Sequence, residues 1–203
     1  MENKQRSAVF LDRDGTINVE KNYLIDPQEF VFVPGAPEAI RALKQAGYLV
    51  VVVTNQSGIA RGYFSVEQVE HLHAHMQHML QEYSTQVDAF YVCPHHPSAG
   101  DGPYTCECTC RKGEPGMLFA AARALNIDLT TSYIVGDKVA DLDAGFAAGC
   151  SPILVRTGYG DKTLQTPTVQ KWQEAGRIAV CADLPTAVQH ILAQPSRMHG
   201  QVR

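Results

Sequence analysis

The chain has 203 residues, 45% hydrophobic and 19% charged, so it can bury a core and differs from disordered, collagen-like or coiled-coil chains. Seventeen Lys and Arg residues against twenty-one Asp and Glu residues give a net charge of −4, which argues against nucleic-acid binding through bulk positive charge. Its apolar runs are far shorter than the ~20 residues of a membrane-spanning helix, and no signal peptide is recognisable. We therefore expect a cytoplasmic, monomeric protein that binds neither nucleic acid nor membranes, with one domain over 1–193 and a flexible tail over 194–203.

Short apolar runs alternate with segments of helical periodicity along the chain. The apolar runs predict buried strands at 8–11, 48–53, 87–92, 133–135, 153–155 and 178–180. The periodic segments predict helices at 37–46, 65–83, 116–125, 139–148 and 184–192. This alternation predicts an α/β fold with a doubly wound parallel sheet, which binds ligands beyond the carboxyl ends of its strands. The polar stretch 161–176 matches no chemical motif, and we interpret it as a surface connection.

An acidic motif, Asp12-Arg13-Asp14-Gly15-Thr16, follows the first predicted strand. Its two carboxylates can converge on one ligand, because Gly15 permits a sharp turn. One carboxylate can attack phosphorus as a nucleophile, and the other can protonate the leaving oxygen and later accept a proton from water. For the motif alone, the alternative is that both aspartates cap a turn.

Other strand ends and one loop supply the remaining groups that phosphoryl transfer needs. The second strand ends in Thr54-Asn55, whose hydroxyl and amide can hold phosphoryl oxygens, and a later strand ends in Asp137-Lys138. Lys112 can neutralise the phosphoryl charge. Because phosphoryl transfer depends on positioning and charge compensation, usually with Mg²⁺, this combination predicts a phosphoryl-transfer site.

The order of these groups resembles the haloacid dehalogenase-like phosphohydrolase superfamily, over residues 9–155. The resemblance implies Asp12 as nucleophile, Asp14 as general acid and then base, and Thr54 and Lys112 as stabilisers of the phosphoryl group. It also implies a catalytic Mg²⁺ held by Asp12, Asp137 and the backbone carbonyl of Asp14.

Asp141, one helical turn beyond Asp137, stays outside this ligand set, because it can either assist the metal or orient Lys138. The segment 16–34 is too short for a separate cap domain, so loops are expected to select the substrate.

Cysteine and histidine residues form two closely spaced pairs, Cys93-Pro-His95 and Cys108-Thr-Cys110. Each pair can offer two ligands to one tetrahedral ion, and three thiolates with an imidazole suit a structural Zn²⁺. Free thiols are the alternative, and His96 or Cys106 could replace a predicted ligand. Four further histidines, His71, His73, His75 and His78, fall in the predicted helix 65–83, where a solvated helix face is favoured over a metal site.

Longer strings, at 10–18, 54–62, 93–97, 108–112 and 135–138, resemble the heptose bisphosphate phosphatases within that superfamily. The resemblance implies hydrolysis of the 7-phosphate of D-glycero-D-manno-heptose 1,7-bisphosphate, a small sugar bisphosphate, in ADP-heptose synthesis for the lipopolysaccharide core. The anomer at C1 is left open. The implied substrate contacts are Glu20, Lys21, Asn22, Tyr23, Thr54, Asn55, Gln56, Ser57, Arg111, Lys112 and Lys138.

Arg111 fits this reading chemically, because a bisphosphate leaves a second anion away from the reacting centre and a guanidinium can grip it in bidentate fashion. Two alternatives remain open. A histidinol-phosphate phosphatase would share the acidic motif and a similar Cys/His loop, and a zinc-stabilised binding protein could retain the fold without catalysis.

Overall fold

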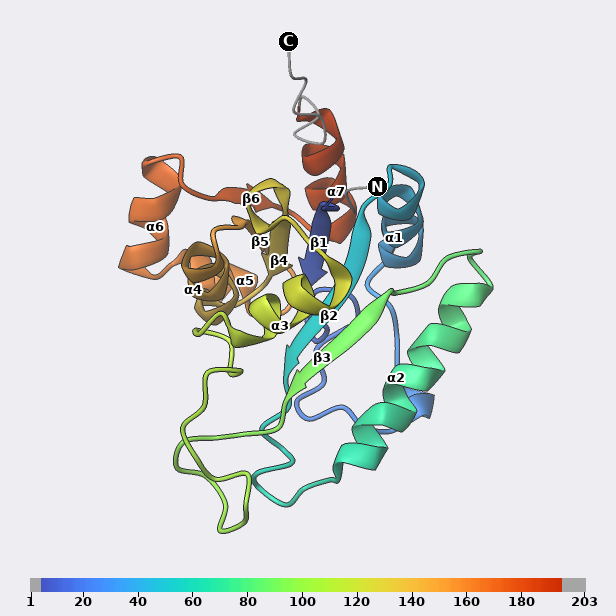
Figure 1. Ribbon diagram of the computed structural model, residues 1–203, viewed down its shortest axis with the longest axis vertical. Helices are drawn as coiled ribbons and strands as arrows, with labels where there is room; N and C mark the ends of the chain where they lie inside the picture. Colours follow the sequence, from blue (N-terminus) through green and yellow to red (C-terminus); the bar gives the residue numbers. More distant parts are fainter. Residues whose placement is uncertain (1–4, 195–203) are drawn as a thin grey trace.

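The central sheet of the computed structural model has six parallel strands in the order β3-β2-β1-β4-β5-β6 (Figure 1). Their bounds are β1 (Ala8–Leu11), β2 (Leu49–Asn55), β3 (Ala89–Cys93), β4 (Tyr133–Gly136), β5 (Ser151–Val155) and β6 (Ala179–Cys181). The chain order reverses between the neighbours β1 and β4, which makes their carboxyl ends the topological switch point. The predicted fold class is confirmed.

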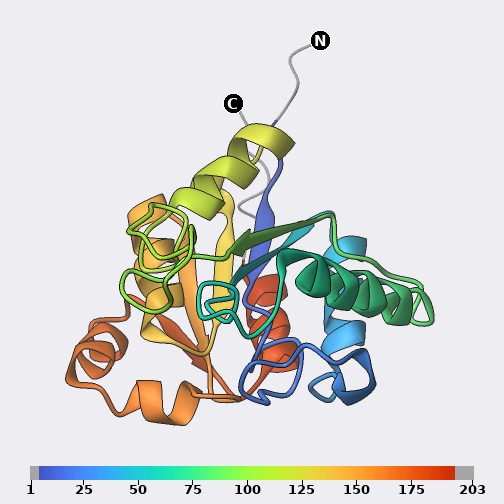
Figure 2. The same cartoon turned by 90° about the horizontal axis from the view of Figure 1, so that it is seen from below.

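Helices cover both faces of this sheet. Figure 2 shows α1 (Ala36–Gln45), α2 (Val66–Gln81) and α7 (Leu184–Ala193) on one side, and α3 (Gly116–Leu125) and α4 (Val139–Ala148) on the other. Alternate residues of β1 enter the two cores: Val9 and Leu11 pack on the first side, Ala8 and Phe10 on the second. Burial on both faces explains why the strands read as continuous apolar runs.

The stretch 161–176 is more than a surface connection, which corrects the sequence interpretation. It contains most of α5 (Gly160–Leu164) and all of α6 (Pro167–Glu174). Val169 of α6 is buried against Leu142 of α4 and Leu154 of β5. Polar residues on the outer face of α6 hide this short apolar contact in the sequence.

The structure describes residues 5–194, so the predicted tail lies outside the described residues except for Gln194. Within that range no helix combines the length and the apolar character needed to cross a membrane. Residues 16–34 contain one short 3-10 helix, η1 (Pro27–Glu29), and a second, η2 (Leu129–Thr131), precedes β4.

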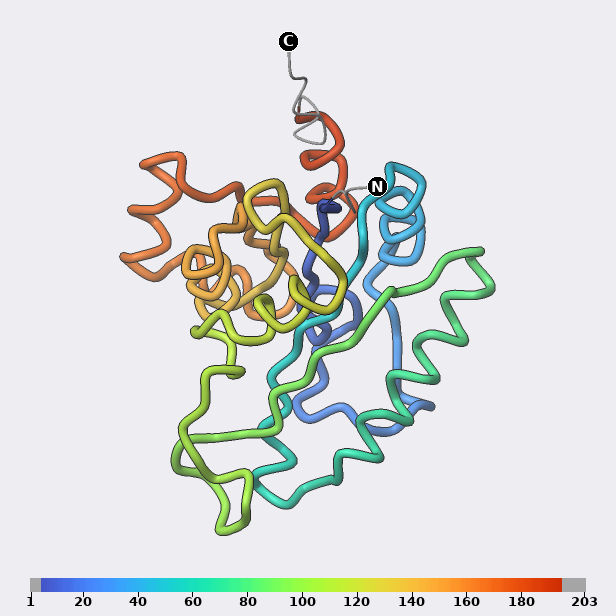
Figure 3. The backbone as a smooth tube through the Cα atoms, viewed as in Figure 1, coloured from blue at the N-terminus to red at the C-terminus, as the bar shows by residue number. Residues whose placement is uncertain are grey.

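A long loop between β3 and α3 extends past the carboxyl ends of the strands. The trace in Figure 3 shows residues 94–115 (yellow-green) running outward beside the turn that follows β2. Arg61 of that turn has its Nη2 3.4 Å from His96 Nε2 in the loop. This contact joins the loop to the turn that follows β2.

Candidate active site

Three neighbouring strands deliver the predicted catalytic groups to one place. Asp12 follows β1, Thr54 lies near the end of β2, and Asp137 follows β4. Beside them is a cavity of about 410 Å³. It is lined by Asp12, Asp14, Glu20, Asn22, Tyr23, Thr54, Asn55, Gln56, Ser57, Arg111, Lys112, Lys138, Ala140, Asp141 and Tyr159. Of the predicted substrate contacts, Lys21 is exposed and does not line this cavity.

Lys112 lies between two buried carboxylates. Its Nζ is 2.5 Å from Asp12 Oδ1 and 2.7 Å from Asp141 Oδ1. Burial alone would lower the pKa of Lys112, but Asp12 and Asp141 outweigh it and raise that pKa above its ordinary value. The lysine is therefore charged, as compensation of a phosphoryl group requires.

Asp141 also caps helix α4, since its Oδ2 accepts a hydrogen bond from the backbone N–H of Lys138 at 3.0 Å. Its carboxylate thus holds the Lys112 ammonium and the Lys138 backbone, whereas the Lys138 ammonium lies near Glu20. These contacts agree with the orienting role that the sequence left open for Asp141, with Lys112 rather than the Lys138 ammonium as the main partner.

Asp137 presents an oxygen that lacks a hydrogen-bond partner among the described residues. Its Oδ2 accepts from the Tyr159 backbone N–H at 2.7 Å, while the buried Oδ1 has only the Lys138 ammonium near it, at 3.5 Å. Burial and the neighbouring Asp12 raise the pKa of Asp137 to about 7. Carboxylate oxygens of Asp12, Asp137 and Asp141 all lie within 4.8 Å of one another. Such a cluster of hard oxygen donors fits a divalent cation such as Mg²⁺.

Asp14 is held by several donors at the edge of the cavity. Its Oδ1 and Oδ2 accept from Arg13 Nη2 at 2.9 and 2.8 Å, and Oδ2 also accepts from Gln56 Nε2 at 2.9 Å. Asn18 Nδ2 donates to Oδ1 at 3.1 Å. Burial alone would raise the pKa of Asp14, but Arg13 and the hydrogen bonds outweigh it and lower that pKa. The side chain is nevertheless 16% exposed, so it can reach a ligand.

The residues at the end of β2 organise their neighbours. Gln56 Nε2 donates to Thr54 Oγ1 at 2.8 Å as well as to Asp14. Asn55 Oδ1 accepts from the backbone N–H of Lys112 at 2.9 Å, and its Nδ2 donates to the Lys112 carbonyl at 3.4 Å. Asn55 therefore fixes the loop that carries Lys112, a role that the motif alone did not show.

Tyr159 is a cavity residue that the sequence did not identify. The Lys138 ammonium lies 4.8 Å from the centre of the Tyr159 ring and 3.4 Å from Glu20 Oε2, so the aromatic ring and the carboxylate together position it. The loop between β5 and α5 brings Tyr159 here, and Thr157 Oγ1 in the same loop donates to the Gly15 carbonyl at 2.6 Å. The sequence signal that could have identified Tyr159 is its position shortly after β5, because the carboxyl end of that strand lies at the same edge of the sheet.

The two Cys/His pairs form one cluster. Cys110 Sγ is 3.4 Å from Cys93 Sγ and 3.3 Å from Cys108 Sγ, and His95 Nδ1 is 3.3 Å from Cys110 Sγ. A tetrahedron with Zn–S bonds of ~2.3 Å has edges of roughly 3.8 Å, so these separations suit a tetrahedral ion. Burial and the neighbouring thiols raise the pKa of Cys93 when no cation is bound. The cluster can hold a metal ion.

The alternative ligands lie outside this cluster. Cys106 is exposed, and His96 Nδ1 accepts from the backbone N–H groups of Ser98 and Ala99 at 3.2 and 2.9 Å. Arg111 links the cluster to the cavity, because its Nη1 donates to the His95 carbonyl at 3.0 Å. The structure thus brings together the four candidate ligands that the spacing favoured, Cys93, His95, Cys108 and Cys110.

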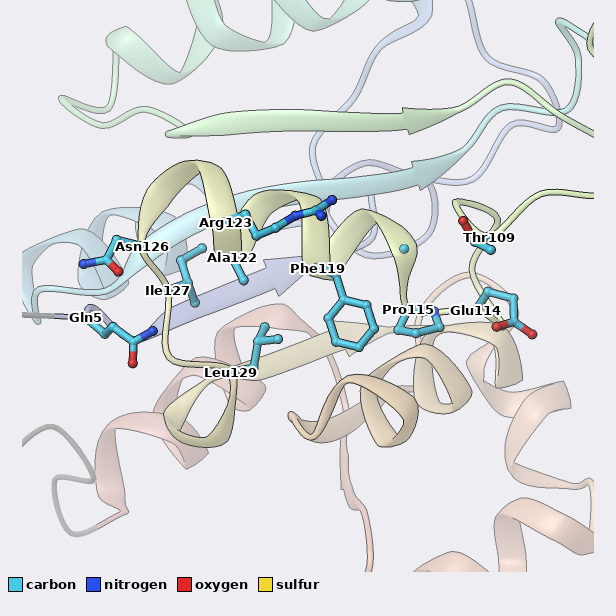
Figure 4. Close-up of a pocket in the computed structure, with 11 residues that line it drawn as sticks. Gln5, Thr109, Glu114, Pro115, Phe119, Ala122, Arg123, Asn126, Ile127 and Leu129 are labelled. Carbon is cyan, nitrogen blue, oxygen red and sulfur yellow. The ribbon is translucent and has the colours of Figure 1, made fainter.

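A larger hollow of about 740 Å³ lies along helix α3 (Figure 4). Phe119, Ala122, Ile127 and Leu129 contribute its apolar lining. None of the site residues predicted from the sequence lines it. The predicted site residues therefore gather at the smaller, polar cavity beside the switch point and not at this hollow.

Known proteins are similar to this chain in sequence and in structure. A sequence model of the HAD-hydrolase-like family matches residues 109–187. The D-glycero-beta-D-manno-heptose-1,7-bisphosphate 7-phosphatase of Photorhabdus laumondii is 43% identical over 187 residues, covering 91% of this chain and 96% of that protein. The protein of the same name from Haemophilus influenzae is 50% identical over 152 residues, 74% of this chain and 82% of that one. The crystal structure of D,D-heptose 1,7-bisphosphate phosphatase from B. bronchiseptica, complexed with magnesium and phosphate, superposes with a TM-score of 0.79 at 38% identity, covering 93% of this chain and 99% of that one.

The fold and the acidic cavity, taken with these relatives, define a haloacid dehalogenase-like phosphatase, which is a phosphoric monoester hydrolase. Within this class, the chain belongs to the heptose 1,7-bisphosphate 7-phosphatase family. The family resemblance drawn from the sequence is confirmed, and the alternative of a non-enzymatic binding protein is wrong.

Proposed function

We propose that this enzyme hydrolyses the 7-phosphate of D-glycero-β-D-manno-heptose 1,7-bisphosphate, as a cytoplasmic, monomeric, single-domain protein in ADP-heptose synthesis for the lipopolysaccharide core. The names of the relatives support the substrate and favour the β anomer. The observation that carries the proposal is the meeting of Asp12, Asp14 and Lys112 at one cavity beside the switch point, with Asp137 clustered against Asp12.

Asp12 is the nucleophile of the proposed mechanism. Its carboxylate attacks the phosphorus at C7 and forms an aspartyl phosphate, while the bond between phosphorus and the C7 oxygen breaks. Asp14 gives a proton to that oxygen, and the negative charge of the bound phosphate favours this protonated form of Asp14. Asp14 then takes a proton from the water that attacks the aspartyl phosphate, which releases inorganic phosphate and restores Asp12.

Charge compensation comes from groups around the phosphoryl position. The charged Lys112 and the Thr54 hydroxyl stabilise the phosphoryl oxygens. Asp12, Asp137 and the backbone carbonyl of Asp14 would hold Mg²⁺, which supplies Lewis-acid stabilisation of the transferring group. The unpartnered Oδ1 of Asp137 supports this assignment.

Binding of the rest of the sugar bisphosphate is assigned to the rim. Arg111 grips the 1-phosphate, and Glu20, Asn22, Tyr23 and Lys138 contact the sugar. Three further predicted contacts, at the end of β2 and directly after it, also line the cavity: Asn55, Gln56 and Ser57. A structural Zn²⁺ on Cys93, His95, Cys108 and Cys110 would fix the loop that presents Arg111, through the His95 carbonyl.

The test is phosphate release with Mg²⁺ from the two heptose 1,7-bisphosphate anomers, histidinol phosphate and fructose 1,6-bisphosphate, compared side by side. We expect preference for the β-heptose bisphosphate, and Asp12→Asn should lower turnover by at least about a thousandfold without unfolding the protein. Asp143→Asn on helix α4 is the matched control. Preference for histidinol phosphate would reject the substrate, and substantial turnover by Asp12→Asn would reject the nucleophile.

A further inference from the structure

One histidine of helix α2 is buried, contrary to the solvated face expected from the sequence. His73 is 4% exposed, whereas His71 on the same helix is exposed. Its ring stacks on Phe90 of β3, with centroids 4.5 Å apart and planes 18° from parallel. Its Nε2 lies 3.2 Å from Arg13 Nη1. His73 therefore joins helix α2 to Arg13 of the acidic motif.

Arg13 is fully buried, with 0% exposure, although it carries a permanent charge. Its Nε donates to Asp14 Oδ1 at 3.1 Å, and its Nη2 donates to both Asp14 oxygens and, at 3.4 Å, to the Leu24 carbonyl. The remaining arm of the guanidinium, Nη1, points to His73. A buried guanidinium is costly unless its donors are paired, so this last contact helps fix the plane of the whole group.

The direction of the hydrogen bond between Arg13 and His73 defines the protonation state of His73. A guanidinium only donates, so Nε2 must accept, and the ring is neutral with its proton on Nδ1. Burial and the nearby Arg13 lower the pKa of His73 to about 3, which is consistent with a neutral acceptor. His73 does not line the cavity and cannot touch the substrate there.

We propose that His73 is a positioning residue for Asp14: it accepts a hydrogen bond from Arg13 and thereby holds the guanidinium in the plane that grips the Asp14 carboxylate. The proposal rests on the proposed role of Asp14 as general acid and base. Hydrogen bonds connect helix α2 to Asp14 in two steps: one joins His73 to Arg13, and others join Arg13 to Asp14.

Two substrates separate positioning of Asp14 from general structural damage. The C7 oxygen of a sugar needs a proton as it leaves, whereas the nitrophenolate of p-nitrophenyl phosphate leaves without one. A misplaced Asp14 therefore slows the first turnover of the sugar bisphosphate far more than the first release of nitrophenolate. Damage to Asp12, Lys112 or the metal site would slow both alike.

The experiment measures first-turnover rates, kcat and KM for four variants: His73→Leu, His73→Gln, His71→Leu and Asp14→Asn. His73→Leu removes the acceptor at similar volume, and we expect a loss in kcat on the order of tenfold to a hundredfold for heptose bisphosphate, with little change in KM. The nitrophenolate first turnover should change less than about threefold. His73→Gln, whose amide oxygen can accept from Arg13, should recover most of the rate, and His71→Leu should match the wild type.

Equal losses with both substrates, or equal behaviour of His73→Gln and His73→Leu, would overturn the proposal. Should His73→Leu fail to fold in thermal melts, His73→Asn, which is polar but too short to reach Arg13, takes its place under the same criteria. Asp14→Asn is the reference. If Asp14→Asn slows the first turnover of both substrates equally, the proposed role of Asp14 fails. If Asp14→Asn slows the sugar bisphosphate more than p-nitrophenyl phosphate and His73→Leu does not, only the role of His73 fails.

Discussion

At the scale of single residues, the proposed role of Asp137 as a cation ligand would couple its charge to cation binding. Burial and Asp12 raise the pKa of Asp137 to about 7 in the metal-free protein, against ~3.9 for an unperturbed aspartate. A carboxyl with a raised pKa stabilises the metal-free fold fully below about pH 4 and loses that contribution as the pH rises through 7. A bound cation needs the ionised form, so its stabilising effect has the opposite pH dependence.

We therefore expect saturation with Mg²⁺ to raise the melting temperature more near pH 8 than near pH 6. At pH 6, ionising Asp137 costs about 1.4 kcal/mol, which corresponds to a difference of roughly 3–6 °C for a chain of this size. Differential scanning fluorimetry across this range measures it, with Asp137→Asn as the variant that should lose the response. An equal or larger Mg²⁺ effect near pH 6 would contradict the assignment of Asp137 as a ligand.

At the scale of elements, the loop between β3 and α3 joins the cysteine cluster to the cavity. Cys93 ends β3 itself, so the cluster is tied to the sheet, while Cys108 and Cys110 come directly before Arg111 and Lys112. The hydrogen bond from Arg111 to the His95 carbonyl closes this connection. An ion in the cluster would therefore order the loop without taking part in the reaction.

Substituting a cluster thiol should release the metal and loosen Arg111. We expect Cys110→Ser to lose bound Zn²⁺ and to raise the KM for heptose bisphosphate by about tenfold, whereas Cys106→Ser, on an exposed thiol of the same loop, should keep both at wild-type values. Elemental analysis by mass spectrometry and steady-state kinetics measure the two effects. Retention of stoichiometric zinc by Cys110→Ser, or its loss from Cys106→Ser, would contradict the ligand set.

At the scale of the whole molecule, the sheet and the clustering of the candidate catalytic carboxylates could be predicted from the sequence for the same reason. Helices cover both faces of the sheet, so each strand is a short apolar run, and the polar residue after each run marks its carboxyl end. Asp12, Thr54 and Asp137 were found at such ends. The ends themselves shift by a few residues, as where β2 continues to Asn55.

Contacts between distant elements could not be predicted in this way. His73 lies about 200° around the helix from the exposed His71, on the buried face of Val69 and Met76, but its contact with Arg13 follows from how α2 packs on the rest of the protein. Tyr159 lies in a stretch without a motif, and it reaches the cavity because β5 neighbours β4 in the sheet. A strand end and the helical period indicate where these two residues lie, but their contacts depend on tertiary packing that neither pattern encodes.

The central claim concerns which phosphate leaves which sugar, and phosphorus NMR follows both groups at once. With Mg²⁺ and D-glycero-β-D-manno-heptose 1,7-bisphosphate, we predict that the signal of the 7-phosphate is replaced by inorganic phosphate while that of the 1-phosphate persists in the product. Asp12→Asn should leave both signals unchanged. Loss of the 1-phosphate signal, or persistence of both signals with the wild-type enzyme, would contradict the account.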